Sequence, residues 1–232
     1  MSPTTPRTLP VEWRPSAAIA RLVGAASLVT IALGVIAQMV FADQVIVAGD
    51  WQASAVAVVA EPSPLRWAAL VSLVEMVAQV VMIAAWARLV LVGSPTWAAI
   101  GGALALAGAV IKTTGVAATT EALPLATGAA PDVDGVAAAL AGAEAAAAIG
   151  VLFLGAGTVA LAIASARARV VPMWVAVVVA VSGSAWLVYL DKPTGDAVFG
   201  AVSLAALVGA LTLAVRFLGW GVGTPHRPMP AE

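Results

Sequence analysis

Six apolar segments, each long enough to cross a lipid bilayer, constrain the fold of this chain more than any other feature of its sequence. A membrane-spanning helix needs about 20 mostly apolar residues. Segments that meet this requirement run over residues 22–41, 65–89, 97–117, 143–164, 173–190 and 197–218. They are too long for strands and do not alternate apolar with polar residues, so they predict helices rather than a β-barrel.

The composition agrees with a lipid environment. Of the 232 residues, 62% are hydrophobic and 10% are charged, whereas soluble domains average about 45–50% apolar and about 25% charged residues. A water-soluble globule of this length does not bury so large an apolar fraction. We therefore predict an all-α, polytopic bundle of about six transmembrane helices in residues 17–218, located in the cytoplasmic membrane. Residues 1–16 and the Gly/Pro-rich residues 219–232 are its predicted cytoplasmic tails.

The side chains that the chain lacks exclude several kinds of chemistry. It has no cysteine and one histidine, His226, so disulfides, iron–sulfur clusters, cysteine zinc sites and bis-histidine haem ligation are excluded within one chain. No P-loop, G-x-S-x-G or H-E-x-x-H motif occurs. A net charge of −1 gives no reason to expect nucleic acid as a partner. We accordingly predict no catalytic residue, cofactor or metal ligand.

Charged residues alternate between the two sides of a six-span arrangement. One side holds Arg7, Arg14, Arg21, Arg88, Arg167, Arg169, Arg216 and Arg227. The other holds Arg66 and Lys192 together with Asp43, Asp50, Glu61, Glu121, Asp132, Asp134, Asp191 and Asp196. Cytoplasmic loops are enriched in lysine and arginine, so both termini are predicted to be cytoplasmic. Aromatic residues predicted to mark the interfaces are Trp13, Trp86, Trp97, Trp174 and Trp220 on the inside and Trp51, Trp67, Trp186 and Tyr189 on the outside.

Residues that start and separate helices predict the boundaries between spans. Candidate helix starts are Ser63–Pro64, Ser94–Pro95, Asp134, Pro172 and Thr194. In the first outer loop, Asp50 is a plausible N-cap for a short interfacial helix that begins with Trp51. The second outer loop, residues 118–134, contains prolines and glycine and is predicted to be irregular.

Small residues form two candidate packing stripes, because they let helix backbones approach closely in lipid. The third span carries Gly101, Ala105, Gly108 and Lys112 on one stripe, and the fourth carries Gly142, Ala146 and Gly150.

Two ionisable residues fall well inside the predicted spans, Glu75 in the second and Lys112 in the third. A charge at a helix centre costs roughly 2.5–3.5 kcal/mol on insertion scales. Glu75 and Lys112 are equally distant from the midpoint between Gly93 and Ser94, where the turn is predicted. An antiparallel hairpin then places both charges at one depth, where each lowers the cost of burying the other.

Further polar residues extend this candidate intramembrane site, which we expect to open to the outside. Ser72 and Gln79 share one helix face with Glu75, Thr113 follows Lys112, and Gln38 lies in the outer half of the first span. In a second interpretation the Glu75–Lys112 pair only locks two helices together. The sequence leaves both interpretations open.

Several short stretches of sequence follow one another in a recognisable order. They are RLVG at residues 21–24, Gly49-Asp50 followed by Ala53 and Ala57, EPSPLR at residues 61–66, and RARVVP at residues 167–172. This order resembles the bacterial membrane family called domain of unknown function 4386, over residues 21–218. The resemblance implies a multi-span bacterial membrane protein and carries over no activity and no functional residues. Glu75 stands where the family pattern suggests an aspartate or a neutral residue.

Three functions are compatible with these features. The absence of catalytic motifs and the small mass outside the spans favour a non-enzymatic partner-binding or regulatory membrane component. Its predicted partners are the lipid bilayer and either another membrane protein or a second copy of the chain. The alternative is a small transporter or channel that uses Glu75 and Lys112 as a polar site. A weaker alternative is a lipid-modifying enzyme with Glu75 as general base, for which no nucleophile or metal ligand is visible.

Overall fold

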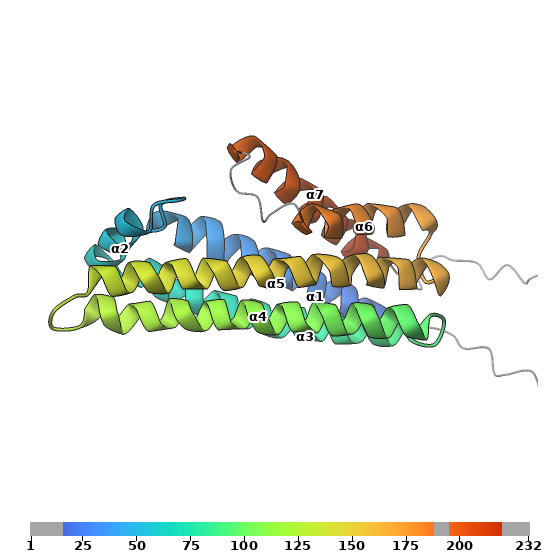
Figure 1. Cartoon of the computed structure of the whole chain (residues 1–232). Coiled ribbons are helices and arrows are strands. Elements are labelled where there is room, and N and C mark those ends of the chain that lie inside the picture. Colours follow the sequence, from blue (N-terminus) through green and yellow to red (C-terminus); the bar gives the residue numbers. More distant parts are fainter. Residues whose placement is uncertain (1–15, 188–194, 220–232) are drawn as a thin grey trace, which may run out of the picture.

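The protein is a bundle of long α-helices (Figure 1). The computed structural model describes residues 16–187 and 195–219, and within them all regular secondary structure is helical. The elements are α1 (Ala17–Val35), the π-helical η1 (Ile36–Phe41), the 3₁₀-helical η2 (Ala42–Gln44), α2 (Trp51–Ala60), α3 (Ser63–Val90), α4 (Pro95–Thr127), α5 (Val133–Arg167), α6 (Met173–Leu187) and α7 (Gly195–Leu218). The expectation of an all-α fold is confirmed for this part of the chain.

Four helical segments are long and apolar enough to cross a membrane: Ala17–Gln44, Ser63–Val90, Pro95–Thr127 and Val133–Arg167. They correspond to the first four predicted spans. The described part of the fifth, α6, has 15 residues, and the remainder of that predicted span lies outside the described residues. The sixth predicted span corresponds to α7, of 24 residues. The predicted tails, with His226, also fall outside the described residues apart from Ser16 and Gly219.

The second outer loop is much shorter than the sequence predicts, because α4 continues through Pro124 and ends at Thr127. A proline inside a helix costs about 3 kcal/mol. Here Ala122 and Ala126 pack with Val136 and Leu140 in a buried cluster, and this packing offsets the cost. The prediction of an irregular segment over residues 118–134 is therefore wrong, because tertiary packing overrides the local signal.

The extension makes α4 and α5 longer than a bilayer core requires. They contain 33 and 35 residues, which at about 1.5 Å per residue give helices about 50 Å long. The hydrocarbon core of a bilayer is only about 30 Å thick. An upright hairpin of this length would therefore extend beyond the hydrocarbon of a bilayer.

Small residues bring α4 and α5 together along their length, as the stripe on the third predicted span indicates. Gly101, Ala105 and Gly108 are buried. A Cβ atom built on Gly108 would lie 2.5 Å from the carbonyl oxygen of Gly150, and one on Gly157 would lie 2.5 Å from the amide nitrogen of Ala105. Only glycine allows the two backbones to approach this closely.

The stripe predicted on the partner helix is confirmed only in part. Gly150 lies in the interface, where an added Cβ would be 2.8 Å from the carbonyl oxygen of Gly108. Gly142 faces open space, with no atom within 4 Å of an added Cβ. The buried seam of α5 instead follows the heptad-like series Val136, Leu140, Gly150, Gly157, Leu161 and Ala164, in steps of three and four residues or their sums, a pattern typical of long antiparallel helix pairs.

Helix starts confirm some of the predicted caps. The short outer helix exists as α2, and Asp50 caps it by accepting a hydrogen bond from the Ala53 amide at 2.9 Å. Ser94 occupies the N-cap position of α4, before Pro95, but its side chain makes no capping hydrogen bond. The carbonyl of Pro172 accepts from the amide of Val175 at the start of α6. The predicted cap Thr194 lies outside the described residues.

Other caps differ by one or two residues. Asp132, not Asp134, caps α5, because its carboxylate accepts from the Gly135 amide at 2.9 Å. Asp134 accepts instead from the side chain of Gln52 at 3.0 Å, which ties α2 to α5. Ser63 is the first residue of α3 rather than its N-cap, a position that Pro62 takes.

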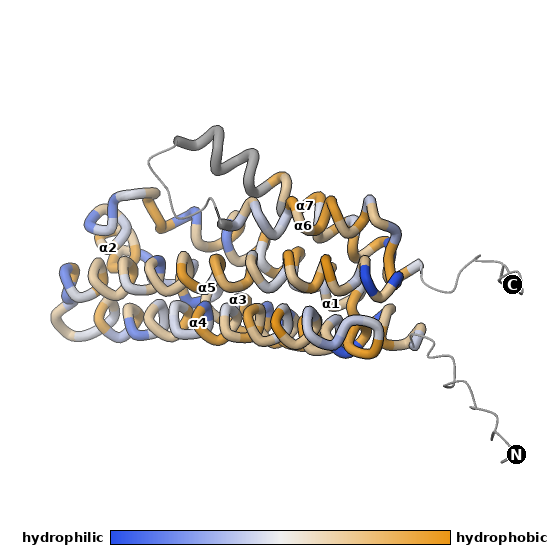
Figure 2. The backbone as a smooth tube through the Cα atoms, turned by 45° about the vertical axis from the view of Figure 1, so that its right-hand side comes forward, coloured by the Kyte–Doolittle hydropathy of each residue, from blue (hydrophilic) through white to orange (hydrophobic). Residues whose placement is uncertain are grey.

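Most of the described basic residues near helix ends gather at one end of the bundle, whereas Arg66 lies near the start of α3 at the other end. Arg21 is near the start of α1, and Arg88, Arg167 and Arg216 lie in the last turns of α3, α5 and α7. These helix ends lie together (Figure 1), and hydrophilic residues gather mainly toward the two ends of the bundle (Figure 2).

Trp86, predicted at the interface, is only 2% exposed, because it packs inside the hydrophobic cluster at the basic end. Trp13, Tyr189 and Trp220 lie outside the described residues.

Candidate functional site

The helical hairpin of α3 and α4 positions the candidate polar site. The first of these helices ends at Val90 and the second begins at Pro95, so the turn lies where the sequence places it. Glu75 and Lys112 therefore sit at the same level on neighbouring antiparallel helices. The predicted juxtaposition of the two charges is present in the structure.

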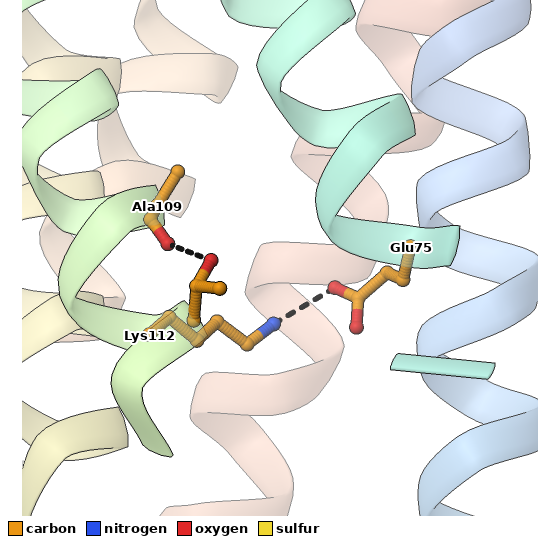
Figure 3. Close-up of polar contacts among 4 residues, drawn as sticks. Glu75, Ala109 and Lys112 are labelled. Carbon is orange, nitrogen blue, oxygen red and sulfur yellow. Dashed lines mark hydrogen bonds and ion pairs between the residues drawn. The ribbon is translucent and has the colours of Figure 1, made fainter. Parts of the chain in front are cut away.

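Glu75 and Lys112 form a direct ion pair (Figure 3). The Nζ atom of Lys112 donates to Oε1 of Glu75 at 2.8 Å. The side chain of Glu75 is 7% exposed and that of Lys112 is 25% exposed. The carboxylate is thus enclosed by protein, while part of the lysine side chain reaches the surface of the bundle.

The backbones of two neighbouring helices come close to this pair at glycines. A Cβ atom added to Gly34 of α1 would lie 3.7 Å from Oε1 of Glu75, so the backbone of α1 passes beside the carboxylate. A Cβ atom added to Gly150 of α5 would lie 2.9 Å from the backbone nitrogen of Lys112. The pair therefore lies where α1, α3 and α4 meet, with α5 packed against the backbone of Lys112.

Two further polar atoms are buried close to this level without a partner. They are Oγ1 of Thr30 and Oε1 of Gln79, neither of which has a hydrogen bond within the described part of the chain. Thr30 precedes Gly34 by four residues, and Gln79 follows Glu75 by four residues. Because α1 and α3 run in opposite directions (Figure 1), both lie one turn from the ion pair, on the side of the basic end.

The remaining predicted site residues differ in their surroundings. Ser72 and Gln79 are half-buried on α3. Thr113 is exposed, and its hydroxyl donates to the carbonyl of Ala109 in its own helix at 2.8 Å (Figure 3). Gln38 is exposed, and its amide donates to Asp43 at 2.9 Å. The amide of Gln38, which lies in η1, is thus engaged with Asp43 rather than with the ion pair.

Sequence reasoning missed Thr30 and Gly34. Their spacing of four residues places them on one face of α1, but the sequence does not indicate that this face packs against Glu75. The register between α1 and α3 is visible only in three dimensions. No group of three or more metal-ligating side chains occurs among the residues described.

The arrangement pairs one carboxylate with one ammonium group next to unpaired hydrogen-bonding atoms. Such a pair is neutral as a whole, and each half is a ready counterion for an opposite charge. Unpaired buried polar atoms are rare in folded proteins and usually indicate water, an ion or a functional role. The oxygens of Thr30 and Gln79 can therefore accept hydrogen bonds from water or from a polar group of a solute.

The family model described as "Domain of unknown function (DUF4386)" matches residues 22–221. No curated protein and no solved structure matches the chain.

Proposed function

The chain belongs to the family of domain of unknown function 4386, and from that premise we propose that it is a six-span protein of the bacterial cytoplasmic membrane with both termini inside. Four long apolar helices support the spanning arrangement. The gathering of arginines at one end of the bundle supports the orientation, because basic residues mark the cytoplasmic side. In this arrangement α6 and α7 supply the fifth and sixth crossings.

The proposed activity is the passage of a small polar solute across the membrane through the site at Glu75 and Lys112. The observation that carries this proposal is that the side-chain oxygens of Thr30 and Gln79 lie one turn from the ion pair and have no hydrogen-bond partner. A pair that only locks two helices needs no further polar atoms. Each unpaired buried group costs about 1–3 kcal/mol, and a bound solute or water recovers that cost.

The charges of the site favour a zwitterionic solute of the amino-acid type. Its ammonium group replaces Lys112 as the partner of Glu75, and its carboxylate replaces Glu75 as the partner of Lys112. The number of buried charges of each sign then stays balanced throughout binding. A singly charged ion would leave one protein charge without a partner, and an unpaired buried charge is strongly unfavourable.

Flux into proteoliposomes tests this proposal. The purified protein is reconstituted, and entry of radiolabelled glycine is compared with entry of potassium and chloride. We expect glycine flux above that of empty liposomes, and Glu75→Gln and Lys112→Met to reduce it at least about tenfold. Glu121→Gln is the matched control, because Glu121 is an exposed carboxylate on α4 away from the pair. Absence of flux for all three probes, or glycine flux that survives Glu75→Gln, would reject the proposal.

A second candidate function is that of a partner-binding membrane component, favoured by the outer end of the molecule. There α2 packs with α4 and α5 around a hydrophobic cluster that includes Ala55, Val58, Ala122 and Val136, separate from the cluster at the basic end. This end therefore has a core of its own and a surface beyond the expected hydrocarbon. Affinity purification from native membranes should recover a stoichiometric companion, whereas recovery of the monomer alone, together with glycine flux, rejects this candidate.

A further inference from the structure

A second polar site lies at the basic end of the bundle, far from the ion pair. A cavity of about 530 Å³ opens there, lined by residues 93–97 and by Arg167. It is formed where the turn between α3 and α4 meets the end of α5. This cavity shares no residue with the site described above.

The cavity presents hydrogen-bond donors from the start of α4. The first amides of any helix have no partner inside the helix. In α4 the amide of Ser94 bonds to the carbonyl of Val90 at 3.0 Å, and Pro95 has no amide hydrogen. The amides of Thr96 and Trp97 remain without a partner in the described parts of the chain, and the Ser94 side chain does not cap them.

Ser94 adds an unused hydroxyl to these amides. The residue lines the cavity, is 6% exposed, and makes no side-chain hydrogen bond among the residues that the structure describes. A buried serine at an N-cap ordinarily accepts from an amide of the first turn. Here the hydroxyl and the two amides stay available to a common third group.

Positive charge completes the site. The guanidinium of Arg167 lies 5.7 Å from the ring centroid of Trp97, a cation–π contact that holds it above the cavity. The neighbouring end of α5 offers few competing acceptors, because the carbonyls of Ala164, Ser165 and Ala166 accept bonds from the residues after the helix. The positive end of the α4 dipole acts in the same direction as Arg167.

The protein keeps this end of the bundle in a fixed shape. A Cβ atom on Gly93 would lie 2.6 Å from that of Ala168, so the turn packs directly against the end of α5. One turn away, Nε1 of Trp86 donates to Oγ of Ser165 at 2.8 Å inside the core. These contacts hold the backbone of the turn between α3 and α4 against the end of α5, where Arg167 lies.

We propose that this cavity binds a phosphate group. A tetrahedral anion accepts hydrogen bonds from the two amides and the serine hydroxyl while it pairs with Arg167, a combination that recurs at anion-binding helix starts. The group belongs either to the headgroup of an anionic phospholipid or to free inorganic phosphate. The site's position at a bundle end, where headgroups lie, makes both sources accessible.

Binding to the full-length protein in neutral detergent tests the proposal. Soluble short-chain phosphatidylglycerol, short-chain phosphatidylcholine and sodium phosphate are titrated at constant ionic strength, and binding is followed by native mass spectrometry and thermal unfolding. Ser94→Asp should weaken binding at least about tenfold, because its carboxylate occupies the amides and repels the anion. The helix start is preserved in this variant, since aspartate is a good N-cap. Arg167→Met should also weaken binding at least about tenfold.

Arg169→Gln is the matched control, because Arg169 is an exposed arginine two residues from Arg167 that does not line the cavity. It should bind as the unmodified protein does. Phosphatidylglycerol binding that phosphate does not displace identifies a lipid headgroup as the ligand, and variant-sensitive binding of phosphate alone identifies the free anion. The proposal is overturned if neither phosphatidylglycerol nor phosphate binds, or if the Ser94→Asp and Arg167→Met variants bind them as tightly as the Arg169→Gln variant does.

Discussion

Lys112 and Glu75 meet at 2.8 Å because both residues lie equally far from the turn that joins α3 and α4. The ion pair thus forms only in the observed register of this hairpin. A shift of one residue in either helix would rotate one charge away from the other by about 100°. The pair consequently contributes to helix register as well as to the chemistry of the site.

Neutralising one member of the pair should destabilise the protein more than neutralising both. Glu75→Leu or Lys112→Leu leaves one charge without a partner and should lower the free energy of unfolding by about 3 kcal/mol. The double variant removes both charges and should recover most of that loss. The measurement is unfolding by sodium dodecyl sulfate in mixed micelles, followed by circular dichroism. Additive losses in the double variant would show that the two charges are not coupled.

The position of this pair was predictable, whereas its surroundings were not. The residue numbers of Glu75, Lys112 and the turn determine their common depth, because helical rise is constant. The approach of Gly34 and Thr30 depends on which face of α1 packs against α3, and the apolar sequence of α1 is nearly uniform around the helix. The continuation of α4 through Pro124 could not be predicted from the sequence for a related reason. It depends on a cluster formed with α2 and α5, which no local pattern reveals.

The glycine seam between α4 and α5 should tolerate no added side chain. Gly108→Ala brings a methyl group within 2.5 Å of a backbone oxygen, so the helices must separate, at a cost of about 1–3 kcal/mol. Gly142→Ala is the control, because an added Cβ there meets no atom within 4 Å. It should stabilise the helix by up to about 1 kcal/mol through higher helix propensity. The unfolding temperatures of the two variants should therefore shift in opposite directions. Equal shifts would show that Gly108 does not lie in a close contact between α4 and α5.

The hydrogen bond between Trp86 and Ser165 should stabilise the basic end. Ser165→Ala removes the acceptor and leaves the indole N–H of Trp86 buried without a partner, a loss of about 1–3 kcal/mol. Ser184→Ala provides the comparison, because Ser184 is exposed and bonds only to the Ala180 carbonyl of its own helix. That change should leave the unfolding temperature nearly unaltered. If both variants unfold alike, the contact between α3 and α5 contributes no stability.

The proposed orientation is open to a direct test because the chain has no cysteine, so any introduced cysteine is the only thiol. Ala130→Cys places it in the exposed turn between α4 and α5, and Arg169→Cys places it in the exposed turn after α5. A membrane-impermeant maleimide applied to intact spheroplasts should label residue 130 readily. Residue 169 should react only after the membrane is permeabilised, since the arginine-rich end faces the cytoplasm. Both variants lie at helix connections, and labelling of denatured protein confirms that each thiol is reactive. The reverse labelling pattern would mean that the arginine-rich end faces the outside of the cell. Labelling of both sites in intact spheroplasts would mean that α5 does not cross the membrane.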